Sequence, residues 1–387
     1  MPVLFLDIGS GTQDALLYSP NMELANCPKF VLPSPARQVS ARIDALTLSG
    51  RDIHLHGLNM GGGFGGAVSR AVTVGRRVTA EPGAAKALAD DPERVRSMGL
   101  DIVEHCPQGS VGVYLTDFDP GFWRAWLSAA GLSLPETVVV AAQDHGYHPG
   151  VSNRISRFKF WERFLREPQD GMVARPESLL MAVPPADLTR LAAIGSATAG
   201  PVADTGAAAM LGALFVPEIE AESRERGILA VNCGNGHTVA FLLFAGRVWG
   251  VYEHHTGLLT PERLREHLDR FARGKLSGEE IFADRGHGCL TMDLPPEAKG
   301  FTPMYVLGPQ RDLLKGAPAA FPAPGGDMML AGCYGLLKAW REMGEEEGPD
   351  GLGLDGPGRT TPSGSSDAPP RGCRSGGCGS RSNSACG

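Results

Sequence analysis

The sequence lacks any apolar run long enough to cross a lipid bilayer. Its longest such run, residues 206–216, is well short of the roughly 20 residues that a membrane-spanning helix needs. The N-terminal apolar stretch contains Asp7, and no basic segment precedes it, so no signal peptide is predicted. Together these absences predict a cytoplasmic protein with no membrane partner.

The chain also lacks an excess of positive charge and a disulfide framework. Its formal net charge is −7, which disfavours nucleic acid and anionic lipid as main partners. Five of the eight cysteines are scattered, and the other three, Cys373, Cys378 and Cys386, lie near the C-terminus. The last three match no familiar zinc-ligand spacing, and the whole set does not predict disulfides.

Length and composition predict four segments. The 387 residues are 42% hydrophobic, which is enough for two cores. We expect an N-terminal lobe over residues 1–148, a helical connecting segment over 149–226 and a C-terminal lobe over 227–343. Residues 344–387 are rich in Gly, Ser, Pro and Glu and predict a disordered tail. The three cysteines of this tail either have no function or bind a metal or form a redox pair.

A stretch near the N-terminus has a counterpart past the middle of the chain. Residues 4–17 read LFLDIGSGTQDALL and residues 229–242 read LAVNCGNGHTVAFL. The aligned polar and glycine pairs are Asp7 with Asn232, Gly9 with Gly234 and Gly11 with Gly236. Each copy predicts two apolar strands joined by a glycine turn, whose bare N–H groups can surround an anion. The repeat predicts two related lobes that face one cleft.

Further elements follow each predicted hairpin. Alternating apolar residues predict strands over 38–48 and 52–60, and a helix over 67–78 follows the glycine run 61–66. That run fits the Gly-x-Gly-x-x-Gly fingerprint of dinucleotide-binding sites. However, a dinucleotide-binding fold does not begin with hairpin strands. We therefore favour the simpler interpretation, in which the glycines begin a helix that packs closely against the sheet. Both lobes are expected to hold one mixed sheet, in the order βββ-α-β-α.

The connecting segment has a different character. Basic and aromatic residues alternate between Arg154 and Arg166, which is typical of a solvated amphipathic helix, although such residues could also grip a phosphate or carboxylate. Helices are predicted over 179–193 and 203–215. The second helix has a face of small residues, which would allow contact with a ligand but favours close packing against another helix.

Two duplicated lobes of this order resemble the superfamily of acetate and sugar kinases, Hsp70 and actin. The resemblance implies an α/β fold of two ribonuclease H-like lobes, with mixed sheets flanked by helices, around a central cleft. It implies that the hairpins are phosphate loops and that Gly325 and Gly326 contact adenosine. It also implies ATP and Mg²⁺ as ligands. Asn232 departs from the pattern, because aspartate is usual at that position.

Several polar turns resemble a narrower, prokaryotic family. They read QDHG at 143–146, DTG at 204–206, GNGHT at 234–238, EHHTG at 253–257 and GHG at 286–288. That family carries the label "putative pyruvate formate-lyase activating enzyme". The Cys-x-x-x-Cys-x-x-Cys triplet with which a radical-SAM activator holds its iron–sulfur cluster does not occur. By analogy, the label implies an ATPase that activates a partner enzyme.

The first hypothesis is a nucleotide-dependent phosphotransferase or ATPase. Asp7 would hold hydrated Mg²⁺, Asp144 would act as a base or orient water, and His145 would assist proton transfer. The predicted nucleotide contacts are Gly9, Gly11, Thr12, Gly234, Asn235, Gly236, Thr238, Gly325 and Gly326.

The second hypothesis is a metal-dependent enzyme. Six of the ten histidines lie in short polar turns: His145, His148, His237, His254, His255 and His287. Their imidazoles, with Asp144 and Glu253, would suit zinc, iron or manganese. The predicted metal ligands are Asp7, Glu253, His254 and His255. A third hypothesis is a non-catalytic regulator that changes shape with nucleotide.

Overall fold

The computed structural model describes residues 1–167 and 173–346. Most of the predicted tail, with Cys373, Cys378 and Cys386, lies outside these residues. The fold is mixed α/β, with three sheets flanked by helices in the described part of the chain.

The first sheet begins with the N-terminal hairpin. Its six strands, in spatial order, are β3 (Lys29–Pro33), β2 (Thr12–Tyr18), β1 (Val3–Ile8), β8 (Thr137–Ala142), β10 (Val202–Ala203) and β9 (Leu180–Met181). β1, β2 and β3 form an antiparallel meander, while β8 runs parallel to β1. From Val138 to Ala142, β8 is apolar and buried, which is typical of a central strand between covered faces.

The second sheet repeats this arrangement. Its strands, in spatial order, are β14 (Gly288–Thr291), β13 (Arg247–His255), β12 (His237–Phe244), β11 (Ile228–Cys233) and β15 (Met304–Leu307). β11, β12 and β13 form an antiparallel meander, and β15 runs parallel to β11. Asp7 pairs with Asp14 in one hairpin as Asn232 pairs with Val239 in the other. The sequence repeat is therefore a structural repeat in the same register.

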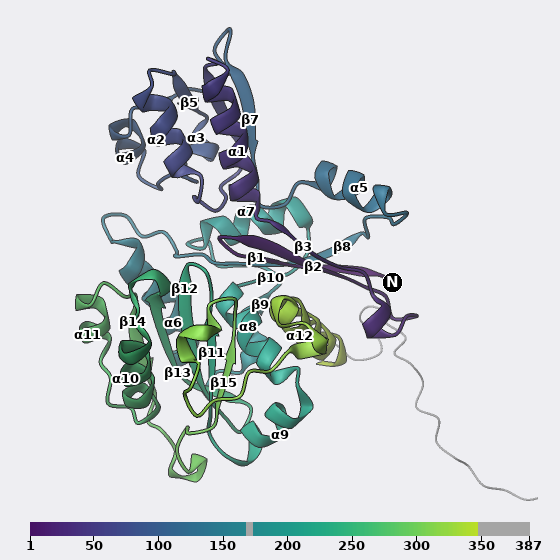
Figure 1. The fold of residues 1–387 in the computed structure, drawn as a ribbon, viewed down its shortest axis with the longest axis vertical. Helices are drawn as coiled ribbons and strands as arrows, with labels where there is room; N and C mark the ends of the chain where they lie inside the picture. Colours follow the sequence, from purple (N-terminus) through teal and green to yellow (C-terminus); the bar gives the residue numbers. More distant parts are fainter. Residues whose placement is uncertain (168–172, 347–387) are drawn as a thin grey trace, which may run out of the picture. The chain divides into compact units, whose positions relative to one another are not determined.

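The third sheet was not foreseen. Its four parallel strands, in spatial order, are β6 (Asp101–Ile102), β5 (Val78–Ala80), β4 (Ile53–Gly57) and β7 (Val111–Leu115). Helices α1 to α4 gather around it (Figure 1) and share a separate apolar core with it. The expectation of one mixed sheet before residue 148 is wrong, because β4 and β7 pair with each other and not with β1–β3. The boundaries of the four predicted segments stay predictions.

The helices have the following bounds: α1 (Pro35–Leu48), α2 (Gly65–Thr73), α3 (Pro82–Ala85), α4 (Pro92–Ser97), α5 (Pro120–Ala129), α6 (Asn153–Arg166), α7 (Thr189–Thr198), α8 (Thr205–Leu214), α9 (Pro217–Glu225), α10 (Pro261–Ala272), α11 (Gly278–Ala283) and α12 (Ala331–Glu346).

Two sequence predictions of secondary structure are wrong. Residues 38–48 are not a strand but most of α1, because Ser34 caps the helix and Pro35 occupies its first turn. The buried residues of α1 follow helical spacing, which the apparent alternation concealed. Residues 179–193 are not one helix either. Pro184 and Pro185 interrupt them, so that β9 precedes the break and α7 follows it.

Small residues let α8 and α12 pack closely, as the sequence predicted. A Cβ on Gly212 would lie 2.2 Å from the carbonyl oxygen of Ala331, and one on Gly335 would lie 2.0 Å from that of Ala208. α12 follows the second sheet in the chain but also lies against β1 and β2 of the first sheet. The N-terminal turns of both helices are thereby placed near the first hairpin.

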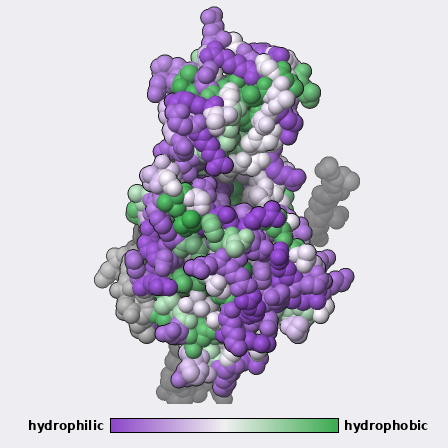
Figure 2. Space-filling view, turned by 90° about the vertical axis from the view of Figure 1, so that its left-hand side faces the viewer, coloured by the Kyte–Doolittle hydropathy of each residue, from purple (hydrophilic) through white to green (hydrophobic). Residues whose placement is uncertain are grey.

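Within residues 1–167 and 173–346, no helix has the length and apolar character needed to cross a membrane. Figure 2 shows one face of the molecule, and hydrophilic residues make up most of it.

Candidate functional site

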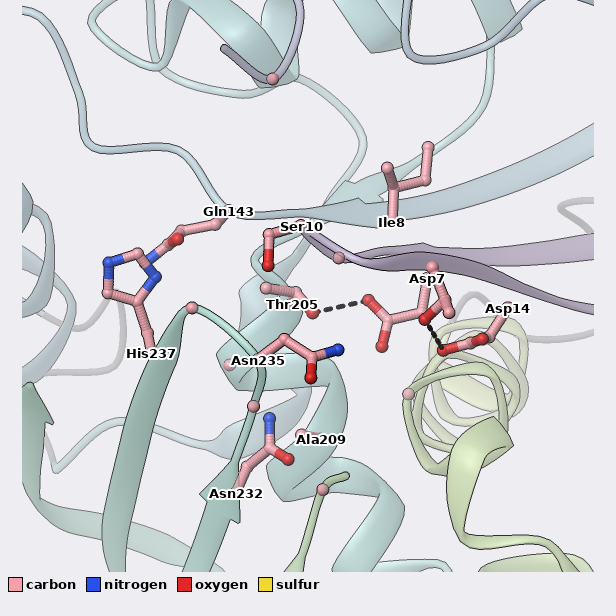
Figure 3. A pocket seen from close by; sticks show the side chains of 18 of the residues that line it. Asp7, Ile8, Ser10, Asp14, Gln143, Thr205, Ala209, Asn232, Asn235 and His237 are labelled. Atoms are coloured by element: carbon pink, nitrogen blue, oxygen red, sulfur yellow. Dashed lines mark hydrogen bonds between the residues drawn. The ribbon is translucent and has the colours of Figure 1, made fainter. Parts of the chain in front are cut away.

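The two glycine hairpins line the same cavity. Its volume is about 250 Å³, and it is bordered by the β1–β2 turn, the β11–β12 turn, and the first turns of α8 and α12. Figure 3 shows side chains from these elements converging on the cavity, with Asp7 and Asp14 at one side and His237 with Gln143 at the other.

The tips of the hairpins are in contact. A Cβ on Gly11 would lie only 2.7 Å from Nδ2 of Asn235, and one on Gly236 would lie 3.3 Å from Oγ of Ser10. A side chain at Gly11 would therefore displace the Asn235 side chain, and glycine favours close approach of the two turns. The repeat thus produces two turns that face each other across one cavity.

Asp7 lies at the end of β1, between the first turns of α8 and α12. Its Oδ1 accepts a hydrogen bond of 2.6 Å from the hydroxyl of Thr205 in α8. A Cβ on Gly332 in α12 would lie 2.0 Å from its Oδ2. Burial raises the pKa of Asp7 to about 7, although the hydrogen bond from Thr205 acts in the opposite direction. The carboxyl therefore gains and loses its proton near neutral pH.

Asp14 lies opposite Asp7 on the neighbouring strand β2. It is buried, and its Oδ1 has no hydrogen-bond partner among the described residues. Burial and the nearby Asp7 carboxylate raise the pKa of Asp14 to about 8. Two facing carboxyls, one with an unpaired oxygen, make an oxygen-rich site that favours a hard divalent cation.

A buried ion cluster lies beside the cavity, formed by Arg157 of α6, Asp204 before α8 and Glu253 of β13. Arg157 donates to both oxygens of Asp204, at 2.6 and 2.8 Å, and to Oε2 of Glu253 at 2.8 Å. Glu253 also accepts from Gln143 and Trp161. Burial opposes its ionisation, but attraction to Arg157 outweighs this and lowers the pKa of Glu253.

A second arginine is held at the cavity wall. Arg190 of α7 makes a two-pronged ion pair with Asp117, at 2.7 and 2.8 Å, and also donates to the carbonyl oxygen of Gln143. Asp117 and Arg190 both line the cavity. A Cβ on Gly61 would lie 2.7 Å from the Arg190 guanidinium, so close packing explains glycine at this position of the 61–66 run.

Asp144 follows β8 in the chain, is buried against the first turn of α7 and does not line the cavity. Its carboxylate accepts from the backbone N–H groups of Gly146, Arg190 and Leu191, at 2.8 to 3.0 Å. Burial raises its pKa, although these three hydrogen bonds act in the opposite direction. Asp144 therefore caps the N-terminus of α7. Its role in catalysis stays a prediction.

The predicted site residues are only partly brought together. Those that line the cavity are Asp7, Gly9, Thr12, His145, Gly234, Asn235 and Gly236. Gly11 lies at the contact between the tips, and the hydroxyl of Thr238 is hydrogen-bonded to that of Thr256. Gly325 and Gly326 form a short turn before α12 and do not line the cavity, although Met328 and Met329 beyond them do. Their contact with adenosine stays a prediction.

The predicted metal ligands lie in different places. Asp7 is in the cavity, whereas Glu253 is occupied by Arg157, Gln143 and Trp161. Both ring nitrogens of His254 are engaged, by Asp284 at 3.2 Å and by the carbonyl oxygen of His255 at 3.1 Å. His255 lies beside His287, with ring centroids 4.5 Å apart. The four residues therefore do not converge on one point, and their ligand role stays a prediction.

Sequence reasoning missed Asp14, Arg157 and Arg190 as parts of the site. Asp14 could have been predicted from the sequence, because it is a charged residue inside an apolar strand and lies opposite Asp7 in the predicted hairpin. Arg157 was assigned to a solvated or ligand-gripping helix face, but it is buried and paired with Asp204 and Glu253. Nothing in the local sequence distinguishes it from Arg154 or Arg163.

A family model matches most of the chain. Residues 60–313, about two thirds of the chain, match the family described as "Putative pyruvate format-lyase activating enzyme (DUF1786)". No curated protein matches the chain in sequence.

Similar solved structures have low TM-scores. They include the inorganic polyphosphate/ATP-glucomannokinase of an Arthrobacter strain, with 13% identity over 89% of this chain and 99% of that one and a TM-score of 0.32. The ROK hexokinase of Thermus thermophilus has 15% identity over 89% and 100% and a TM-score of 0.29. ADP-bound MreB5 of Spiroplasma citri has 10% identity over 90% and 99% and a TM-score of 0.27. The two-lobed assignment accordingly depends on the strand order and register within this chain.

Proposed function

The chain belongs to the family with that description, and we propose that it binds a nucleoside triphosphate with Mg²⁺ in the cavity between the two hairpins. The observation that carries the proposal is the contact of the two repeated turns across one cavity. The backbone of the two turns and the N-terminal ends of α8 and α12 supply partial positive charge where polyphosphate oxygens would lie. The polyphosphate would lie between the lobes, in contact with both.

The charges of the cavity make the cation a necessary part of the ligand. Asp7, Asp14 and Asp117 line it, while Arg190 is paired with Asp117 and Arg157 with Asp204 and Glu253. A bare polyphosphate would be repelled by Asp7 and Asp14 whenever their carboxyls are ionised. Asp7 and Asp14 fit Mg²⁺, because both are hard oxygen donors and one oxygen of Asp14 has no other partner. The cation would neutralise charge on the phosphates.

The cavity is small for a whole nucleotide. At about 250 Å³ it is just below the roughly 300–1,000 Å³ of typical ligand pockets, so it accommodates the phosphates better than the nucleoside. We therefore expect the cleft to widen when ATP binds. Such a movement of lobes is a usual switching device and would serve either an ATPase or a regulator of a partner enzyme. The family description favours a partner enzyme as the target of that switch.

Calorimetry with ATP and ADP, each with and without Mg²⁺, tests this proposal. Mg²⁺·ATP should bind the wild type, and Gly332→Ala should weaken binding by more than about tenfold, or 1.4 kcal/mol, because the new Cβ displaces the Asp7 carboxylate. Gly11→Val should do the same by separating the hairpin tips. Gly257→Ala is the matched control, since a Cβ at this exposed turn meets no atom within 4 Å.

Absence of Mg²⁺·ATP and Mg²⁺·ADP binding to the folded wild type at millimolar nucleotide would refute the proposal. Equal binding by Gly332→Ala, Gly11→Val and Gly257→Ala would place the nucleotide elsewhere. Phosphate release from bound ATP distinguishes an ATPase from a regulator that binds without turnover, and transfer to an added acceptor identifies a phosphotransferase.

A further inference from the structure

Three histidines meet beside the cavity, from separate parts of the chain. His145 follows β8, His237 begins β12 and His287 precedes β14. Each offers a ring nitrogen, and the three nitrogens lie within 4.8 Å of one another. In the described part of the chain this is the one group of three His, Cys, Asp or Glu side chains that is close enough to share an ion.

Two ring nitrogens of this group lack protein partners. Nε2 of His237 and Nδ1 of His287 are both buried and have no hydrogen bond among the described residues. A buried polar atom without a partner costs about 1–3 kcal/mol, so two in one cluster call for a physical cause. By contrast, the neighbouring His254 has both ring nitrogens engaged.

We propose that His145, His237 and His287 bind one divalent transition-metal ion, such as Zn²⁺ or Fe²⁺, with a fourth coordination position open to the cavity. Imidazole nitrogens suit these ions and do not suit Mg²⁺, so this site is distinct from the oxygen site of Asp7 and Asp14. His145 and His237 line the cavity, which places the open position on that side.

The buried ion cluster supplies a compensating charge. One guanidinium (Arg157) and two carboxylates (Asp204 and Glu253) leave one net negative charge, and Glu253 interacts electrostatically with both His237 and His287. A buried net charge without compensation is costly, and a dication beside it reduces that cost.

Only small side-chain movements are needed. Three nitrogens around a four-coordinate Zn²⁺, with metal–nitrogen distances of about 2.0–2.1 Å, lie about 3.4 Å apart. The three nitrogens now lie within 4.8 Å of one another, so metal binding would bring each pair closer by at most about 1.4 Å. Three protein ligands with an open fourth position are typical of catalytic rather than structural metal sites, so a bound water or a phosphate oxygen would occupy the fourth position.

Elemental analysis and a Co²⁺ titration test the site without nucleotide. Wild-type protein purified without chelator should carry one zinc or iron per chain. After chelator treatment it should bind one Co²⁺ and acquire the intense visible bands of four-coordinate cobalt. His237→Ala and His287→Ala should each weaken Co²⁺ binding by more than the roughly 10–100-fold that loss of an outer-shell partner costs. His105→Ala, at an exposed histidine outside the cluster, is the matched control.

Substoichiometric metal together with no cobalt bands would overturn the proposal, and so would equal Co²⁺ affinity in His287→Ala and His105→Ala. The wild-type measurements decide the matter even if a variant does not fold, and circular dichroism of each variant identifies that case. Because no nucleotide is present, failure here leaves the proposed ATP site untouched, and failure of ATP binding leaves this site untouched.

Discussion

Arg157→Met should lower the free energy of unfolding by about 3–5 kcal/mol, which is the usual cost of removing one partner from a buried ion pair. Arg157 is the only cation bonded to the buried carboxylates of Asp204 and Glu253 within the described residues. Without it both carboxylates must either stay charged in an apolar environment or take up protons. Urea denaturation of the full chain measures the loss, provided that the m-value is unchanged.

Arg166→Met on the same helix is the matched control for Arg157→Met. Arg166 is exposed and, among the described residues, pairs with the exposed Glu162, so its replacement should cost no more than about 1 kcal/mol. Adding Glu253→Gln and Asp204→Asn to Arg157→Met should recover part of the loss, because the stranded charges cause it. Equal, small losses in Arg157→Met and Arg166→Met would contradict this account of the cluster.

The ionisation of Asp7 and Asp14 should make the metal-free protein less stable as the pH rises. Both pKa values are raised, from an ordinary value of 3.8 to about 7 and about 8. The folded protein therefore holds extra protons, and the stability that they contribute is fully present below about pH 4 and lost as the pH rises through 7 and 8. The buried histidines, whose pKa values are lowered, act in the opposite direction below pH 6.5.

A difference between variants isolates the carboxyl effect from that of the histidines. Asp14→Asn should gain at least about 2 kcal/mol relative to wild type between pH 5 and pH 9, because it cannot acquire the unfavourable charge. Urea denaturation at both pH values measures this, and Asp293→Asn, at an exposed aspartate, is the control. A difference from wild type that is the same at pH 5 and pH 9 would show that Asp14 ionises normally.

The raised pKa values of Asp7 and Asp14 also predict how the stabilising effect of Mg²⁺ depends on pH. Mg²⁺ binds the ionised carboxyls, so it competes with their protons. The rise in melting temperature that Mg²⁺ alone produces should be larger at pH 8.5 than at pH 6, and it should be smaller in Asp14→Asn at both. Thermal unfolding followed by circular dichroism gives this comparison without nucleotide. A pH-independent effect of Mg²⁺ would mean that it binds outside the Asp7–Asp14 pair.

The two hairpins could be predicted because their information is local. A polar residue at the end of an apolar strand, followed by Gly-x-Gly and a second strand, specifies a hairpin wherever it occurs, and its repetition identified both lobes. The register of Asp7 with Asp14 and of Asn232 with Val239 agrees with that repeat. The inserted parallel sheet was missed because nothing local states which strands pair, and α1 was missed because short apolar patterns fit both periods.

The sequence by itself determined the turns, most of the strands and the repeat that relates the two hairpins. These features follow from backbone conformation and from the spacing of apolar residues over short stretches. Only the tertiary structure decided which polar residues act together. It brought Arg157 to Asp204 and Glu253, and His145 to His237 and His287, across separations of 47 to 142 residues that no spacing rule covers. Contacts between distant segments arise from packing of the two sheets and their helices, and a side chain's pKa or ligand role depends on those contacts.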